Sequence, residues 1–189
     1  KEFFKSDFFN IVFAGNIGEA QSFKTIIEAV NNIKELPVNV IVIGDGRYKK
    51  TALNLIKEKG LENHFNFLDS FPSTEMPKFF AHADGLLVSL KKNKIFSLTI
   101  PAKIQSYLAC AKPIIASIDG IGAKIVTDAN CGVVSPAENM LVLSDRIKEL
   151  MSLDKSKLYE MGMNSRTYYE KEFDRTYLLE KLEAILEDR

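Results

Sequence analysis

Residues 99–116 read TIPAKIQSYLACAKPIIA, and they decide the fold because they hold a helix between two buried strands. Pro101 marks the start of the helix, where the missing N–H of proline is no loss, and Pro113 marks a point past its end. The apolar run 85–90 comes before the helix, and the run 113–117 follows it. Two buried strands joined through a helix are typical of a parallel sheet.

The same alternation extends outward over the rest of the chain. Apolar runs predict four more strands, at residues 8–14, 38–43, 65–68 and 132–135. Apolar residues at helical spacing predict the helices, at residues 23–36, 48–59, 74–82, 101–112, 123–129, 141–151, 155–169 and 177–186. We predict one α/β domain over residues 1–189. Its core is a doubly wound, Rossmann-like parallel sheet of about six strands in the order 3-2-1-4-5-6, with helices on both faces and a helical C-terminus.

Composition narrows the classes of partner. The 25 basic and 25 acidic residues give a formal net charge of zero, so the chain as a whole has no electrostatic argument for binding nucleic acid or an anionic membrane. Cys110 and Cys131 have no metal-type spacing, which is typical of reduced thiols in a cytosolic protein. The N-terminal residues lack a signal-peptide core, and no apolar run approaches the roughly 20 residues of a membrane span. We expect a small complete domain or a fragment of a larger protein.

The predicted strand order places a crevice between strands one and four, where the loops 15–21 and 93–103 meet. The helix that starts at Pro101 directs unpaired N–H groups and a positive partial charge at this crevice, which favours an anion. Lys103 sits in the first turn, where the helix dipole disfavours a cation. A phosphate shared by Lys103 and the helix end explains this placement. Ser106, one turn later, is placed to bind a ribose or sugar hydroxyl.

Two glycine-containing loops are weaker signals. Gly15 and Gly18 let the backbone approach a phosphate, but strand-to-helix turns also use glycine for their dihedral angles alone. The spacing is not G-x-G-x-x-G, which argues against an NAD(P) oxidoreductase. In the loop 44–47, Arg47 contacting a nucleotide and Asp45 capping the next helix explain the residues equally well.

Acid–base and metal chemistry have little support in the sequence. His64 and His82 are the only histidines, and neither belongs to a nucleophile or metal pattern. We therefore predict no catalytic residue within this chain and no metal or other cofactor.

Six groups of residues resemble, in order, the C-terminal domain of the GT-B fold, family 4 retaining glycosyltransferases. They are FAGNIGEAQ at 13–21, IGDG at 43–46, AD at 83–84, IPAK at 100–103, YLACAKPIIA at 107–116 and CGVV at 131–134. The first group is similar to that of bacterial enzymes that build capsule and O-antigen sugars. The resemblance covers nearly the whole chain.

The resemblance implies a domain that binds a nucleotide-sugar donor, expected to be a UDP-sugar. The full-length enzyme would transfer the sugar with retention to a glycan or lipid-linked acceptor, which a preceding domain holds. We expect this chain alone to be inactive. The enzyme is expected in the cytoplasm, with contact to the inner face of the plasma membrane only through the missing domain.

The chain departs from the family pattern at four positions. Asn16 and Gln21 stand where the family has an arginine and a lysine for the diphosphate, and Leu98 and Ser106 stand where it has the Glu-x7-Glu pair. We expect Lys103, the helix N-terminus and the Gly18 amide to hold the diphosphate, and the backbone amides of 97–100 to contact the sugar. The predicted donor-binding set is Gly15, Asn16, Gly18, Gln21, Gly44, Asp45, Gly46, Arg47, Phe71, Ser97, Leu98, Thr99, Ile100, Lys103 and Ser106.

Two alternatives stay open. The lost glutamates and loop cations suit a non-catalytic nucleotide or sugar sensor. A sugar-nucleotide epimerase shares the GT-B plan and is a lesser alternative.

Overall fold

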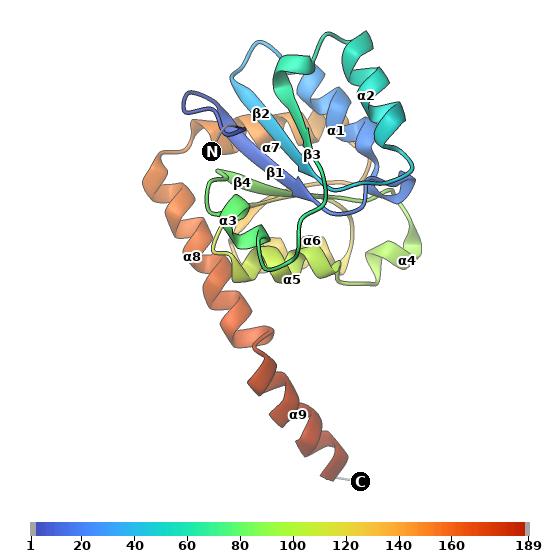
Figure 1. Ribbon diagram of the computed structural model, residues 1–189. Coiled ribbons are helices and arrows are strands. Elements are labelled where there is room, and N and C mark those ends of the chain that lie inside the picture. The colour runs from blue at the N-terminus through green and yellow to red at the C-terminus, as the bar shows by residue number, and fades with distance from the viewer. Residues whose placement is uncertain (1–2, 188–189) are drawn as a thin grey trace.

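A six-stranded parallel sheet in the order β3-β2-β1-β4-β5-β6 forms the centre of the computed structural model, which describes residues 3–187 (Figure 1). The predicted strand order is therefore confirmed. The strands are β1 (Phe9–Ala14), β2 (Val38–Ile43), β3 (Phe65–Leu68), β4 (Gly85–Ser89), β5 (Ile114–Ser117) and β6 (Gly132–Ser135). Every residue of β2 is buried, as expected for a parallel strand covered on both faces.

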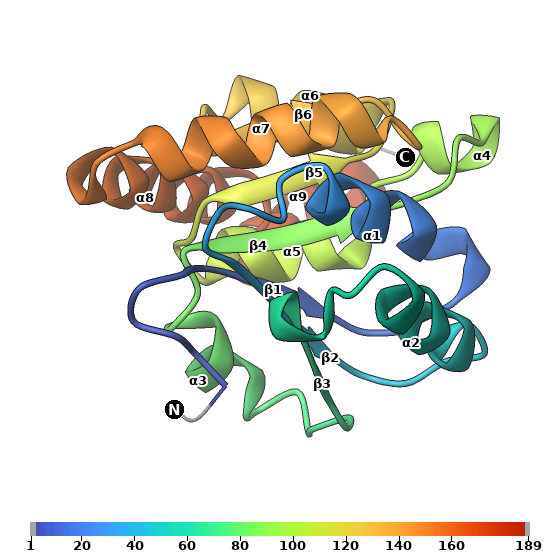
Figure 2. The same cartoon turned by 90° about the horizontal axis from the view of Figure 1, so that it is seen from above.

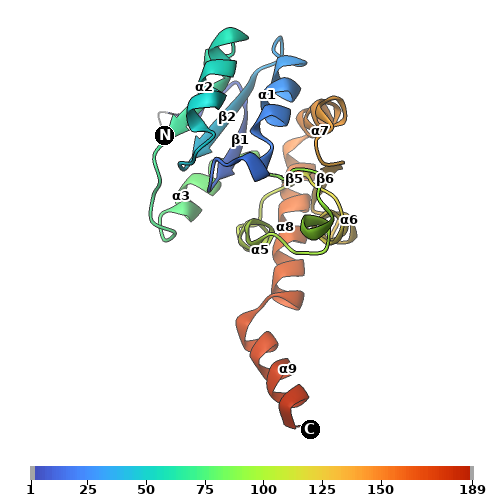
Figure 3. The same cartoon turned by 90° about the vertical axis from the view of Figure 1, so that its right-hand side faces the viewer.

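Helices cover both faces of the sheet. The bounds are α1 (Phe23–Asn31), α2 (Lys49–Glu58), α3 (Met76–Phe80), α4 (Lys94–Ser97), α5 (Ala102–Ala109), α6 (Ile121–Asp128), α7 (Met140–Ser152), α8 (Lys155–Glu172) and α9 (Arg175–Glu187), with short 3-10 turns at Glu19–Gln21 and Glu62–His64. Figure 3 shows α1, α2 and α7 on one face and α3, α5 and α6 on the other. Each face has its own buried apolar cluster.

The alternating direction of the side chains along β1 explains how one strand contributes residues to both apolar clusters. Successive side chains of a strand point to opposite faces. Ile11 and Phe13 accordingly belong to the cluster under α1 and α7, whereas Val12 belongs to the cluster under α5. The view from above shows α7 lying over β5 and β6, with α1 beside it (Figure 2).

Some predicted boundaries were wrong. Helix α4 was not predicted; it is one turn long, and the Asn93 side chain caps it by accepting a hydrogen bond from the Ile95 N–H at 2.8 Å. Pro101 occupies the cap position, and α5 begins one residue later. Helix α9 extends away from the sheet beyond the end of α8 (Figure 1). Within residues 3–187 no helix has both the length and the apolar character needed to cross a bilayer.

Candidate functional site

The strands β1 and β4 separate toward their carboxyl ends. Their register runs through Ile11–Gly85 and Val12–Leu86, although β1 continues to Ala14. This divergence opens the crevice that the strand order predicts.

Tyr107 of α5 bridges the two separated strands. Its hydroxyl accepts a hydrogen bond from the Ala14 N–H at 3.2 Å and donates one to the Leu87 carbonyl oxygen at 3.3 Å. The side chain is 1% exposed, and burial raises the pKa of its hydroxyl. The hydroxyl therefore stays neutral and keeps the proton that it donates to Leu87. Nothing in the sequence indicates this bridge.

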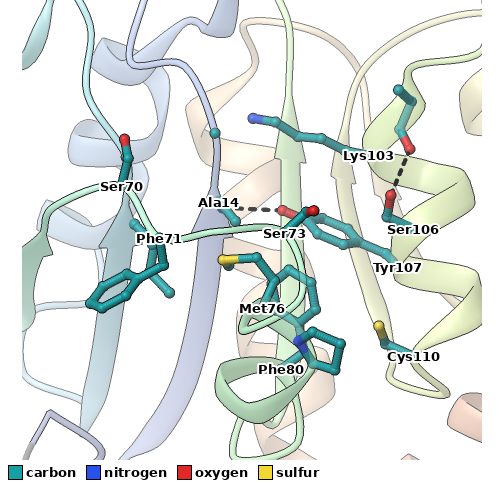
Figure 4. Close-up of a pocket in the computed structure, with 15 residues that line it drawn as sticks. Ala14, Ser70, Phe71, Ser73, Met76, Phe80, Lys103, Ser106, Tyr107 and Cys110 are labelled. Carbon is teal, nitrogen blue, oxygen red and sulfur yellow. Dashed lines mark hydrogen bonds between the residues drawn. The ribbon is translucent and has the colours of Figure 1, made fainter.

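A cavity of about 520 Å³ lies between α5 and the loop after β3 (Figure 4). Five predicted site residues line it, namely Gly15, Gly44, Phe71, Lys103 and Ser106. Much of the remaining wall is apolar and includes Met76 and Phe80 of α3. The cavity can therefore accept a flat, mostly apolar group that carries an anion at one end.

Lys103 reaches across the crevice from the first turn of α5 toward the loop after β1 (Figure 4). Its Nζ atom is buried, has no hydrogen-bond partner within residues 3–187, and lies 3.6 Å from the centre of the Phe13 ring. Burial lowers the pKa of Lys103 from 10.5 to about 7, because the charged form loses its water. The Pro101 side chain does not cap α5, so a bound anion can meet both the ammonium and the N–H groups of the first turn.

The loops after β1 and β2 are held together by close backbone contact. Gly44 has a φ of +143°, and a Cβ there would overlap the carbonyl oxygen of Gly15. The Ile17 N–H donates to the Asp45 carbonyl oxygen at 2.8 Å. A packing role thus accounts for Gly44, and likewise for Gly46, where a Cβ would overlap the backbone of Ile17.

The interpretation of Asp45 as a helix cap was wrong. Helix α2 begins at Lys49, its cap position is Tyr48, and no side chain caps it. The Asp45 carboxylate instead lies 3.9 Å from the Lys49 Nζ. Asp45 sits too far before the first turn of α2 for its oxygens to reach the free N–H groups.

Asn16, Gly18, Gln21 and Arg47 line a second hollow of about 500 Å³ beside the first loop. The Gln21 Oε1 accepts hydrogen bonds from the Gly18 N–H at 3.1 Å and from the Asn16 Nδ2 at 3.4 Å. The Gly18 amide, predicted to hold the diphosphate, therefore already donates to Gln21. Arg47 is exposed and supplies the cation of this hollow.

Residues 97–100 lie on α4 and in the loop after it, outside the lining of the 520 Å³ cavity. The N–H groups of Ser97, Leu98 and Thr99 donate to the carbonyl oxygens of Asn93, Ile95 and Phe96 at 3.1, 3.1 and 3.3 Å. A sugar contact by these three amides requires this turn to open. The Leu98 side chain is 64% exposed and Ile100 is 37% exposed.

Phe71 and Ser106 stand on opposite walls of the cavity. The Phe71 ring is 42% exposed and packs on the Phe79 ring with 4.7 Å between the ring centres, which leaves an aromatic surface open to a planar ligand. The Ser106 Oγ donates to the Ala102 carbonyl oxygen at 3.3 Å. Its lone pairs remain available to accept from a ligand hydroxyl.

The site has groups that bind but lacks a cluster of acid–base residues. Across residues 3–187 no three His, Cys, Asp or Glu side chains gather to form a metal site. What the crevice offers is one buried cation, a helix N-terminus and an apolar cavity. This set can hold and stabilise an anion that carries a flat group.

Most of the chain matches a known protein family. The family described as "Glycosyl transferases group 1" matches residues 1–168. The chain is 24% identical over 173 residues to the putative colanic acid biosynthesis glycosyl transferase WcaI of Escherichia coli (strain K12), covering 89% of this chain and 40% of WcaI.

Solved structures share the fold. Anabaena Alr3699/HepE in complex with UDP superposes with a TM-score of 0.84 at 19% identity, over 97% of this chain and 50% of that one. The same protein in complex with UDP-glucose gives a TM-score of 0.83 at 19% identity with the same coverage. This chain therefore spans 40% of the length of WcaI and half of the length of the HepE chain.

Proposed function

The chain belongs to the glycosyl transferases group 1 family, and from that premise we propose that it is the donor-binding domain of a glycosyltransferase that uses a UDP-sugar. Beside the uncapped first turn of α5, the buried Lys103 ammonium has no hydrogen-bond partner among residues 3–187, and this observation carries the proposal. A buried cation without a counter-charge favours an anionic ligand. The HepE complexes with UDP and UDP-glucose support a nucleotide-sugar as that ligand.

The crevice suggests where each part of the donor lies. The diphosphate meets Lys103 and the N-terminus of α5, while the base and ribose occupy the apolar cavity against Phe71, with Ser106 facing the ribose hydroxyls. The sugar then extends toward residues 97–100. When the glycosidic bond breaks, the ammonium and the helix N–H groups stabilise the leaving diphosphate without a metal ion.

We further propose that the enzyme is a family 4 glycosyltransferase that retains configuration and is of the type that builds capsule and O-antigen sugars. WcaI, a putative colanic acid biosynthesis enzyme, supports a role in polysaccharide synthesis. We propose that the acceptor is a glycan or lipid-linked sugar held by a preceding domain, and that this chain alone does not transfer sugar. The two free thiols, Cys110 and Cys131, suit a cytoplasmic location, with membrane contact made through the acceptor domain.

A calorimetric titration with UDP tests the site. Lys103→Ala is expected to weaken binding at least about tenfold, the effect of losing a charge-assisted hydrogen bond. Lys112→Met is the matched control, because Lys112 is a partly buried lysine past the end of α5 whose Nζ donates to the Ala83 carbonyl oxygen at 2.8 Å, before β4 begins. UDP binding by Lys103→Ala at parental strength would overturn the assignment of Lys103.

A non-catalytic nucleotide-sugar-binding domain is the second candidate. It is favoured by the neutral pair Asn16 and Gln21 in the first loop and by the exposed Leu98 at a position where the family has a glutamate. Joining the chain to its native upstream segment and assaying sugar transfer separates the two candidates. Transfer supports the glycosyltransferase, whereas UDP binding without transfer supports the second candidate.

A further inference from the structure

We propose that Phe13 is a positioning residue of the donor site, whose ring face holds the Lys103 side chain in the crevice in its charged form. This inference rests on the proposed function for the identity of the anion. The pairing of the Phe13 ring with the Lys103 ammonium comes from the structure alone.

The contact between the two side chains is close and well defined. The Lys103 Nζ lies 3.6 Å from the centre of the Phe13 ring, well inside the roughly 6 Å range of a cation–π interaction. The Phe13 ring is itself held edge-on by Phe23, with 4.8 Å between ring centres and 77° between ring planes. Both rings are buried, so the face that Phe13 presents to the ammonium is fixed.

Gly15 makes the path for the lysine. A Cβ on Gly15 would lie 2.8 Å from the Lys103 Cε and 3.2 Å from its Nζ. The side chain therefore passes over bare backbone at the end of β1 to reach a ring that belongs to the cluster on the other face of the sheet. A longer residue at position 15 would push the ammonium off the ring.

Within the described residues, no carboxylate pairs with the Lys103 ammonium in place of the ring. On α5 and at its C-terminal cap the titratable groups other than Lys103 that line the cavity are Tyr107 and Cys110, and burial raises the pKa of both, which keeps them neutral. Acidic groups on the surrounding loops lie next to other lysines: Asp45 and Asp69 are 3.9 and 3.4 Å from the Lys49 Nζ, and Glu19 is 3.4 Å from the Lys91 Nζ. Arg47 is exposed at the neighbouring hollow.

The charge of the site, which Lys103 carries, therefore depends on the Phe13 ring. Burial strongly disfavours the ammonium and brings its pKa to about 7, so a modest stabilising contact decides how much of it stays charged near neutral pH. The ring contributes that contact and leaves the ammonium without a hydrogen-bond partner. A phosphate can then bind without displacing a protein carboxylate.

The test weakens the ring electronically without changing its size much. Phenylalanine analogues with one, two and three ring fluorines are placed at position 13, and the Lys103 signal is followed by NMR in protein with 13C-labelled lysine, assigned by its loss in Lys103→Met. The titration midpoint of Lys103, expected near the pKa of about 7 that burial gives this side chain, should fall stepwise by about one pH unit, or tenfold in proton affinity. The same analogues at Phe23 are the control and should leave the midpoint unchanged.

UDP binding against pH gives the second readout. With the fluorinated analogues at position 13, the pH above which UDP affinity falls should decrease in parallel with the titration midpoint of Lys103. Phe13→Leu removes the ring but keeps an apolar side chain, and it should lower this pH in the same way. The ionisation of UDP itself is the same with every protein variant, so a difference between variants arises from the protein. A Lys103 midpoint that does not respond to fluorination at Phe13 overturns this proposal even if UDP binds through Lys103. If the Lys103 midpoint falls on fluorination of Phe13 but the protein does not bind UDP, the pairing of Phe13 with Lys103 is supported and the proposed function is overturned instead.

Discussion

The side chain of Lys103 occupies the space that a side chain on Gly15 would need, because a Cβ added to Gly15 would lie only 2.8 Å from the Lys103 Cε. Gly15 also has a φ of +124°, a conformation that side chains rarely adopt. These two facts link the first loop to the side chain of Lys103. They explain the glycine by a close approach as well as by its dihedral angle.

Gly15→Ala should therefore lose both stability and binding. Backbone strain costs about 1–3 kcal/mol of unfolding free energy, measured in urea, and displacement of Lys103 weakens UDP binding in a calorimetric titration. Gly60→Ala is the matched control, since Gly60 has a φ of +66° and open space around it. That control should lose stability alone. Unchanged UDP affinity in Gly15→Ala would show that Lys103 does not need this path.

Tyr107→Phe should destabilise the fold by about 1–3 kcal/mol. The substitution removes the hydroxyl that joins the Ala14 N–H to the Leu87 carbonyl oxygen and leaves both buried groups without that partner. Equilibrium unfolding measures the loss, with Tyr159→Phe as the control because Tyr159 is 71% exposed. Equal stabilities for the two variants would contradict the bridging role.

The stability of the parent should rise with pH because of Lys103. Below about pH 7 the lysine is protonated in both the folded and unfolded states, and its burial is costly. From about 7 to 10.5 the folded protein releases this proton while the unfolded chain keeps it, so the unfolding free energy increases with pH. The increase is at most about 1.4 kcal/mol per pH unit.

Unfolding curves of the parent and of Lys103→Met across this range measure the effect. The difference between them isolates Lys103 from the other titrating groups. Parallel pH profiles for the two proteins would rule out a neutral-range titration of Lys103.

Gln21→Lys should strengthen UDP binding a few-fold at low salt. The change frees the Gly18 N–H from the Gln21 oxygen and places a second cation at the first loop. The gain should shrink as salt is added, because an exposed charge is screened. Gln105→Lys adds the same charge at an exposed position on α5 outside the cavity and should have little effect. An equal gain in both variants would indicate general attraction rather than a site at the first loop.

Much of the fold follows from local patterns. The run at residues 38–43, apolar except for Asn39, predicts a strand buried on both faces, and all six residues of β2 are buried. Strand order then follows from right-handed crossovers, which leave few arrangements for alternating strands and helices. Part of the site was predictable in the same way, since Lys103 is conspicuous as a cation in the first turn of a helix at the crevice.

Local patterns misjudged features that depend on a neighbour in space. The spacing of Asp45 suggested a cap, but α2 starts later because the loop first pairs with Ile17. The backbone amides of 97–100 were expected to contact the sugar, yet those of Ser97, Leu98 and Thr99 donate within the turn of α4. Each outcome was set by contacts between segments that the sequence does not place together.

By itself, the sequence determined the six strands and their order, the helices other than α4, and Lys103 as the candidate cation. The spacing of apolar residues along the chain predicts strands and helices, and the handedness of crossovers limits the strand order. Only the tertiary structure decided what the cation meets. Lys103 lies against Phe13 and Gly15, and Tyr107 bridges β1 and β4, because α5 packs where these strands diverge. The environment of a buried charge is a property of packing between distant segments, and for Lys103 this environment lowers the pKa.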